Sequence, residues 1–135
     1  MIDGFAFHHL GLATRHPDRA AAFVTTLGYA LDAPVWDPLQ QVHVRLGHHP
    51  SMPTVELVWP GDGPSPIDGV LERAGAGPYH LCWEVDDLDA AADALGDAGH
   101  RIFPVTEPTP AVLFGGRRVW FLTVHGFGLV ELLER

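Results

Sequence analysis

Two histidines and two glutamates stand at matching places in an internal repeat of this sequence. When the sequence is moved back by 71 positions, His80 falls on His9, and each histidine opens a short apolar strand. Each copy later holds one apolar strand with a single carboxylate, Glu56 47 residues after His9 and Glu131 51 residues after His80. Internal repetition sets the architecture of a chain. We therefore expect the repeat to bring the two histidines and the two glutamates together in equivalent positions.

The four side chains make a plausible donor set for one divalent metal ion. Two imidazoles and two carboxylates suit a borderline ion such as Zn, Ni, Co or Mn. Four polar groups that face inward on otherwise apolar strands would be costly without such a partner. The alternative is that Glu56 and Glu131 face solvent on half-exposed strands, which is the more common situation for either glutamate taken alone. The repeat, which matches all four positions, favours the metal site.

Other residues that could do chemistry fit the repeat less well. His8 is expected to point opposite to its neighbour in the strand, which favours a packed or surface histidine. His48 and His49 fall in a loop that contains proline, where a solvated or lid role is the more plausible one. Cys82 shares the face of His80 and could line a cavity, although a buried, inert thiol is the more common case.

Length and composition describe a single domain of ordinary globular type. A chain of 135 residues can bury a core without disulfides, and 47% apolar with 19% charged residues is typical of soluble proteins. A net charge of −9 with only eight basic residues argues against nucleic acid as a partner. The single Cys82 excludes an internal disulfide. No signal peptide or membrane-spanning apolar stretch is visible, so we expect a cytoplasmic protein without a membrane partner.

The pattern of strands and helices predicts an α+β fold of two tandem βαβββ modules within one domain, 1–135. Module 1 covers about residues 7–60, the connector 61–77 and module 2 about 78–133. In module 1 we expect strands Phe7–Thr14, Tyr29–Val35, Gln41–Leu46 and Pro53–Trp59, with a helix from Pro17 to Leu27. In module 2 we expect strands Tyr79–Val85, Arg101–Val105, Arg118–Val124 and Leu129–Leu133, with a helix Leu88–Ala98 capped by Asp87 or Asp86.

Several segments of the chain also carry a family resemblance. They are 7–13 (FHHLGLA), 55–60 (VELVWP), 65–71 (SPIDGVL), 77–87 (GPYHLCWEVDD) and 128–132 (GLVEL). Together they resemble the vicinal oxygen chelate superfamily, which includes glyoxalases, bleomycin-resistance proteins and ring-cleaving dioxygenases. The similarity covers roughly residues 7–133 and is closest to the methylmalonyl-CoA epimerase-like members.

The resemblance implies both a site and a chemistry. It implies metal ligands His9, Glu56, His80 and Glu131, a cup-shaped mixed sheet around them, and a homodimer. The function implied is a metal-dependent isomerase, epimerase or lyase that acts through a metal-stabilised enolate. The substrate would be a small acyl thioester, possibly carried on CoA or a carrier protein, or a 2-oxo compound. A ligating carboxylate, with Glu131 favoured over Glu56, would exchange the proton next to the carbonyl.

One position departs from the epimerase branch of the family. That branch usually has a second carboxylate on the strand that leads to the second ligand, where this chain has Leu39 with Gln40 beside it. Neither side chain can usefully accept a proton near pH 7. We therefore expect weak epimerisation of methylmalonyl-CoA itself and related chemistry on another substrate.

Three other functions stay open at this level. A ring-cleaving dioxygenase of the same superfamily would use Fe(II) with two histidines and one carboxylate, and the additional Glu56 counts against it. A drug-binding protein of the bleomycin-resistance type would need no metal. A non-catalytic member whose site has decayed is the third alternative.

Overall fold

The computed structural model describes residues 1–135 and contains three α-helices and ten strands of a mixed sheet. The predicted α+β class is therefore confirmed. The chain divides into two compact units, which we call the N-terminal unit (His9–Tyr79) and the C-terminal unit (Met1–His8 with His80–Arg135). None of the helices combines the length and apolar character needed to cross a membrane. The organisation of the units as one domain with the module limits given above stays a prediction.

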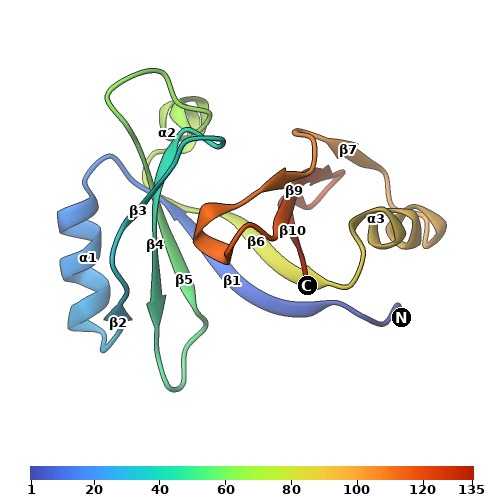
Figure 1. Ribbon diagram of the computed structural model, residues 1–135, viewed down its shortest axis with the longest axis horizontal. Coiled ribbons are helices and arrows are strands. Elements are labelled where there is room, and N and C mark those ends of the chain that lie inside the picture. The colour runs from blue at the N-terminus through green and yellow to red at the C-terminus, as the bar shows by residue number, and fades with distance from the viewer. The chain divides into compact units, whose positions relative to one another are not determined.

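In the N-terminal unit, strand β5 lies between a parallel and an antiparallel neighbour. The elements are β1 (Ala6–Ala13, of which 9–13 belong to this unit), α1 (Pro17–Thr26), β2 (Ala30–Leu31), β3 (Val35–Asp37), β4 (Val42–His48), β5 (Val55–Pro60) and α2 (Asp68–Ala74). Their strand order is β2-β4-β5-β1, and β3 also pairs with β4 (Figure 1). β5 runs parallel to β1 and antiparallel to β4.

Helix α1 covers one face of this part of the sheet. Pro17 suits the first turn of a helix because its missing N–H would have had no partner there, and Gly28 follows the end with a φ of 99°. Val24 of the helix packs against Val55 and Leu57 of β5 in one buried cluster. Because side chains alternate along a strand, the residue between Val55 and Leu57 points to the opposite face. That residue is Glu56.

The C-terminal unit has the same strand arrangement as the N-terminal unit. Its elements are β6 (Gly77–Val85, of which 80–85 belong to this unit), α3 (Leu88–Asp97), β7 (Ile102–Pro104), β8 (Thr109–Pro110), a single 3-10 turn (Val112–Phe114), β9 (Arg118–Val124) and β10 (Gly128–Glu134). Their strand order is β6-β10-β9-β7, and β8 also pairs with β9. β10 runs parallel to β6 and antiparallel to β9, as β5 does with β1 and β4.

Helix α3 covers the face of its own unit that corresponds to the face covered by α1. Asp87 caps the helix, because its side chain accepts the backbone N–H of Ala90 at 2.7 Å, so the predicted cap is confirmed. Leu88 packs with Val130 and Leu132 in the core of this unit. Glu131, between the two β10 residues, therefore points away from α3.

The second strand of module 1 is interrupted, which differs from the prediction. Within the expected strand Tyr29–Val35, Ala30–Leu31 form β2, and Val35 already belongs to a separate piece, β3. Pro34 between the pieces has no N–H to donate to the ladder. In the C-terminal unit, the expected strand Arg101–Val105 is present as β7, and a second short piece, β8, also pairs with β9. The βαβββ scheme is kept with its second strand broken in two.

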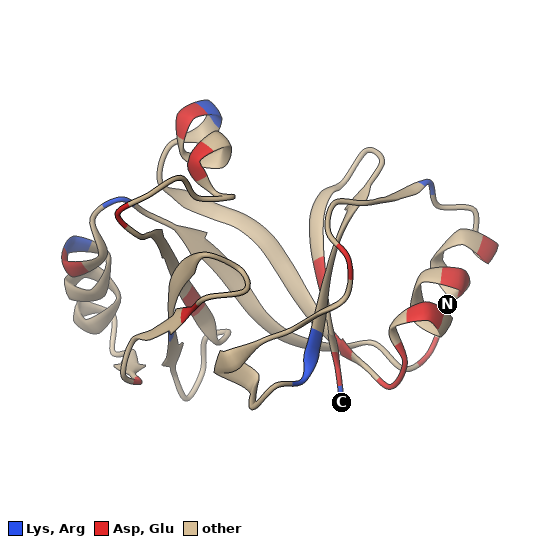
Figure 2. Ribbon diagram, turned by 45° about the horizontal axis from the view of Figure 1, so that its top comes forward, with Lys and Arg blue, Asp and Glu red and all other residues tan.

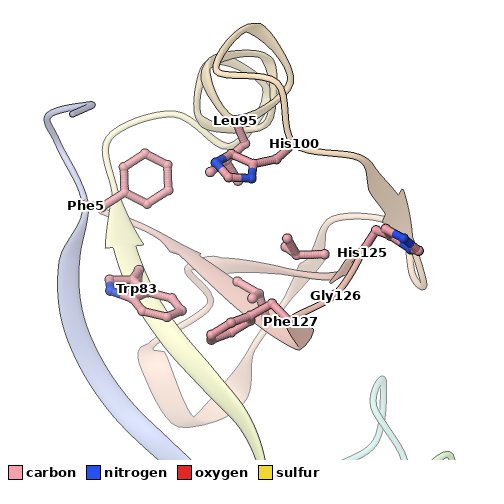
Figure 3. Close-up of a pocket in the computed structure, with 9 residues that line it drawn as sticks. Phe5, Trp83, Leu95, His100, His125, Gly126 and Phe127 are labelled. Atoms are coloured by element: carbon pink, nitrogen blue, oxygen red, sulfur yellow. The ribbon is translucent and has the colours of Figure 1, made fainter.

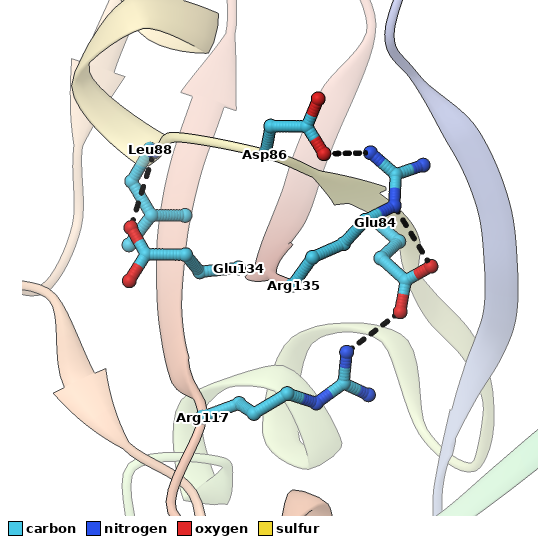
Figure 4. Close-up of polar contacts among 6 residues, drawn as sticks. All are labelled: Glu84, Asp86, Leu88, Arg117, Glu134 and Arg135. Carbon is cyan, nitrogen blue, oxygen red and sulfur yellow. Dashed lines mark hydrogen bonds and ion pairs between the residues drawn. The ribbon is translucent and has the colours of Figure 1, made fainter.

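Charged residues of the C-terminal unit gather in two places. Helix α3 carries Asp89, Asp93 and Asp97, and acidic positions along it are visible in Figure 2. A second group, near the C-terminus, is a chain of ion pairs that Figure 4 shows. Arg117 Nη1 donates to Glu84 Oε2 at 2.6 Å, and Arg135 reaches both Glu84 and Asp86, at 3.3 and 2.7 Å. The bond of Arg117 joins the start of β9 to β6, and the bonds of Arg135 join the end of β10 to the end of β6.

Hydrogen bonds from arginine change the acidity of two glutamates in this unit. The hydrogen bond from Arg117 lowers the pKa of Glu84 below its usual 4.5. Arg118 binds Glu134 through two bonds of 3.0 and 2.8 Å and lowers the pKa of that carboxyl in the same way. Both carboxylates are therefore held in the charged form near neutral pH.

Candidate metal and active site

In the N-terminal unit, His9 on β1 and Glu56 on β5 face each other. Nε2 of His9 lies 3.6 Å from Oε1 of Glu56. Both side chains are deeply buried, with exposed fractions of 0% and 5%. Ionisable groups at this depth cost free energy unless charges or hydrogen bonds compensate for the lost water. The structure thus brings together two of the four predicted site residues.

The register of β1 and β5 explains this contact. The strands are parallel, and Gly11 stands opposite Glu56. His9 comes two residues before Gly11, so its side chain points to the same face of the sheet as the carboxylate. Gly11 itself contributes no side chain on that face. The imidazole and the carboxylate can therefore approach each other diagonally across the strands.

The C-terminal unit repeats the arrangement with His80 on β6 and Glu131 on β10. Nε2 of His80 lies 3.4 Å from Oε1 of Glu131, and the residues are 3% and 2% exposed. Here Cys82 stands opposite Glu131 on the parallel strand, and His80 comes two residues before it. In both units, the glutamate faces a residue of the parallel strand, Gly11 or Cys82, and the histidine comes two residues before that residue.

Phe121 contacts the C-terminal pair, although the sequence pattern does not single it out. It lies on β9 directly opposite Glu131. Its ring centroid is 5.2 Å from that of His80, and the rings are nearly perpendicular, at 88°. An aromatic residue on an apolar strand is ordinarily a core residue, so only the strand register reveals this contact.

Leu39, where the epimerase branch has a second carboxylate, lies in the turn after β3 with 61% of its surface exposed. The turn is shaped by Asp37, which is completely buried. One oxygen of Asp37 accepts the backbone N–H groups of Leu39 and Gln40, both at 3.0 Å. The other accepts the side-chain amide of Gln40 at 2.8 Å. Asp37 thus acts as a structural acceptor in this turn.

His43 lies on the opposite face of β4 and β5 from Glu56. It pairs with Trp59, whereas Glu56 pairs with Leu46, three positions further along β4. An odd number of positions places two side chains on opposite faces of a strand. Its ring stacks on Trp59 at 5.5 Å and lies 4.7 Å from Trp36. The structure therefore places His43 in an aromatic ladder, away from the His9–Glu56 pair.

The two histidines expected in the following loop have different roles. His48 ends β4 and forms an exposed ion pair of 2.9 Å with Asp32. Nδ1 of His49 accepts the N–H groups of Ser51 and Met52 at 3.0 and 3.1 Å, and its Nε2–H donates to Leu27 O at 3.2 Å. His49 therefore fastens the β4–β5 loop to the end of α1.

Cys82 is fully buried, in a cluster with Ala111, Val119 and Leu133. As predicted, it shares the face of His80, two residues away on β6. A thiol enclosed by aliphatic side chains behaves as a small apolar group.

A cavity of about 380 Å³ lies within the C-terminal unit on the other face of its sheet. Figure 3 shows Phe5, Trp83 and Phe127 around this hollow, with His100 near its upper edge. Trp83 and Val130 line this cavity. Trp83 comes three residues after His80 on β6, and Val130 comes one residue before Glu131 on β10, so both point to the opposite face of the sheet from the pair. The cavity is therefore separated from the His80–Glu131 pair by the sheet itself.

Comparison with known proteins decides the family. Residues 8–121 match the Glyoxalase/Bleomycin resistance protein/Dioxygenase superfamily. The chain belongs to this superfamily. The predicted resemblance is thus confirmed, and the strand arrangement of the two units is that of a superfamily fold also found in solved methylmalonyl-CoA epimerases.

Within the superfamily, the chain is similar to proteins that are named as epimerases. It is 38% identical over 130 residues to the ethylmalonyl-CoA/methylmalonyl-CoA epimerase of Cereibacter sphaeroides, with 93% of this chain and 94% of that protein covered. It is 36% identical over 85 residues to the mitochondrial methylmalonyl-CoA epimerase of Dictyostelium discoideum, with 60% and 49% covered. The crystal structure of methylmalonyl-CoA epimerase from Mycobacterium tuberculosis matches with a TM-score of 0.76 and 28% identity, covering 96% and 87%. These likenesses support an enzyme of the epimerase and isomerase class.

Proposed function

We propose that this enzyme exchanges the proton on the α-carbon of a 2-alkylmalonyl-type acyl-CoA and interconverts its two stereoisomers whenever the proton returns to the opposite face. The observation that carries the proposal is the likeness, over 93% of the chain, to an epimerase named for two such thioesters. The geometry adds a buried carboxylate beside an imidazole in each unit. A carboxylate is a suitable base for an α-proton when the negative charge that develops on the substrate is stabilised.

We also propose that His9, Glu56, His80 and Glu131 bind the same divalent ion. Two donors about 2.0–2.2 Å from a tetrahedral ion lie roughly 3.3–3.6 Å apart. The nitrogen–oxygen separations of 3.6 and 3.4 Å within the two pairs fit this spacing. Imidazole and carboxylate donors suit Zn, Ni, Co or Mn. When bound, such an ion would polarise a substrate carbonyl and stabilise the negative charge of an enolate.

We assign the proton exchange to Glu131 ahead of Glu56. Glu131 stands opposite Phe121 and beside His80, so two planar rings border its carboxylate on the face of the sheet that carries the site. The corresponding neighbour of Glu56 on β4 is Leu46. A base held in a fixed position loses less free energy in reaching the reactive geometry.

Hydrogen exchange tests this function directly. Each stereoisomer of methylmalonyl-CoA and ethylmalonyl-CoA is incubated in D₂O with the metal-loaded enzyme, and deuterium at the α-carbon is followed by NMR. We expect exchange with the wild type and a loss of about 10²–10⁴-fold in Glu131→Gln. Glu107→Gln, in an exposed loop, is the matched control.

Two results would contradict parts of the proposal. Absence of exchange with every thioester would exclude the epimerase function, and oxygen uptake with an aromatic diol would then favour a ring-cleaving dioxygenase. Undiminished exchange in Glu131→Gln would exclude Glu131 as the base and leave Glu56 as the candidate. Lyase activity, the homodimer and the cytoplasmic location stay predictions.

A further inference from the structure

The two His–Glu pairs have equivalent strand registers. They differ in the residue that faces the glutamate from the antiparallel strand on its other side. Each glutamate also faces a residue on an antiparallel strand, which is Phe121 on β9 for Glu131 and Leu46 on β4 for Glu56. Glu56 and Glu131 are 75 positions apart in the sequence, and Leu46 and Phe121 are separated by the same number. The repeat therefore places an aromatic ring at one position and an aliphatic side chain at its counterpart.

The ring of Phe121 lies against the imidazole of His80. The two centroids are 5.2 Å apart at an angle of 88°, which is the edge-to-face arrangement that aromatic pairs prefer. An imidazole in such a contact cannot rotate about its bond to Cβ without losing it. The same imidazole directs Nε2 toward Glu131 at 3.4 Å. The contact thus favours the orientation that the His80–Glu131 pair requires.

The backbone of Phe121 is held by the segment that precedes β8. Its N–H donates to the hydroxyl of Thr106 at 3.2 Å, and its carbonyl accepts the N–H of Val105 at 2.9 Å. The indole N–H of Trp120 donates to the carbonyl of Thr106 at 2.7 Å. These three bonds all join β9 to residues 105 and 106, on one side of the strand, at the point from which the ring projects.

We propose that Phe121 is a positioning residue for His80. This inference rests on the proposed metal site and adds that the two halves of the site are unequal. The His80–Glu131 half is preorganised by an aromatic contact, whereas Leu46, at the equivalent place in the N-terminal unit, supplies no ring to orient His9. Groups that orient a metal-binding histidine contribute to affinity although they do not touch the ion.

Cobalt binding to the full-length, metal-free protein tests this role. The affinity is measured by titration with Co²⁺ and by competition with a chelator, and the visible absorption of bound Co²⁺ reports the ligand geometry. We expect Phe121→Leu to weaken Co²⁺ binding about 10–100-fold and to change that spectrum. Phe121→Tyr, which keeps the ring, is expected to restore both. Phe103→Leu, a half-exposed position on β7, is the control.

The outcomes separate this inference from the proposed function. If the wild type binds no Co²⁺, the metal site itself is wrong. If the wild type binds Co²⁺ and Phe121→Leu has the same affinity and spectrum, the positioning role is wrong, even where thermal stability has fallen. If the leucine variant does not fold, Phe121→Met keeps much of the volume without a ring and is judged by the same two measurements.

Discussion

Leu39 donates its backbone N–H to the buried carboxylate of Asp37 over 3.0 Å. This bond involves only the main chain of Leu39, while its side chain is 61% exposed. A substitution at Leu39 can therefore change the chemistry of the turn without breaking the bond that shapes it. A new carboxylate there would also remain in water, where its desolvation cost is small.

We predict that Leu39→Glu raises the rate at which methylmalonyl-CoA epimerises. A two-base epimerase removes a proton on one face of the substrate and returns one on the other, and wild-type Leu39 cannot take part. The measurement is the interconversion of the two stereoisomers, with Leu39→Gln as a control of equal size that lacks a base. Wild-type turnover on the order of 10 per second would show that the lack of a carboxylate at Leu39 does not limit epimerisation.

We predict about one divalent ion per chain after reconstitution, and its loss in His80→Ala. Removal of one imidazole leaves Glu131 without the donor 3.4 Å away. A ligand that binds only the folded state stabilises it, so wild-type protein should also melt at a higher temperature with metal than without. Elemental analysis and thermal unfolding check both statements. His125→Ala removes an exposed histidine and should bind metal like the wild type; equal metal content in His80→Ala would contradict the site.

Acid should destabilise the fold through Glu84 and Glu134. Hydrogen bonds from Arg117 and Arg118 lower the pKa values of these carboxyls below the usual 4.5. Their contribution to stability is therefore fully present above pH 4.5 and is lost as the pH falls through the lowered values. Denaturant titrations across this range should show a smaller acid-induced loss in Glu84→Gln than in the wild type. An identical pH profile would mean that Glu84 does not contribute to this loss.

His49→Ala should destabilise the N-terminal unit by about 1–2 kcal/mol, since two backbone N–H groups and one carbonyl lose their partner. The neighbouring His48→Ala removes only an exposed ion pair and should change stability by less than about 1 kcal/mol. Chemical denaturation of both variants measures the difference. Equal effects would show that the loop contacts of His49 contribute no more than a surface pair.

Much of the candidate site can be predicted from the sequence. The repeat identifies His9 with His80 and Glu56 with Glu131, and alternation along each strand predicts which face carries them. Local signals also predict α1 and α3, because Pro17 and Asp87 suit helix starts and Gly28 suits a position just beyond a helix end. The interruption at Pro34 is not predicted, because the apolar residues on either side of it resemble one continuous strand.

The sequence by itself therefore determined the superfamily, the order of strands and helices, and the four candidate donors. Only the tertiary structure decided that Gly11 and Cys82 face the glutamates, that Phe121 contacts His80, and that Asp37 shapes the turn at Leu39. The reason is physical. Periodicity along a strand is a local property, whereas cross-strand neighbours depend on which distant strands pair and in which register.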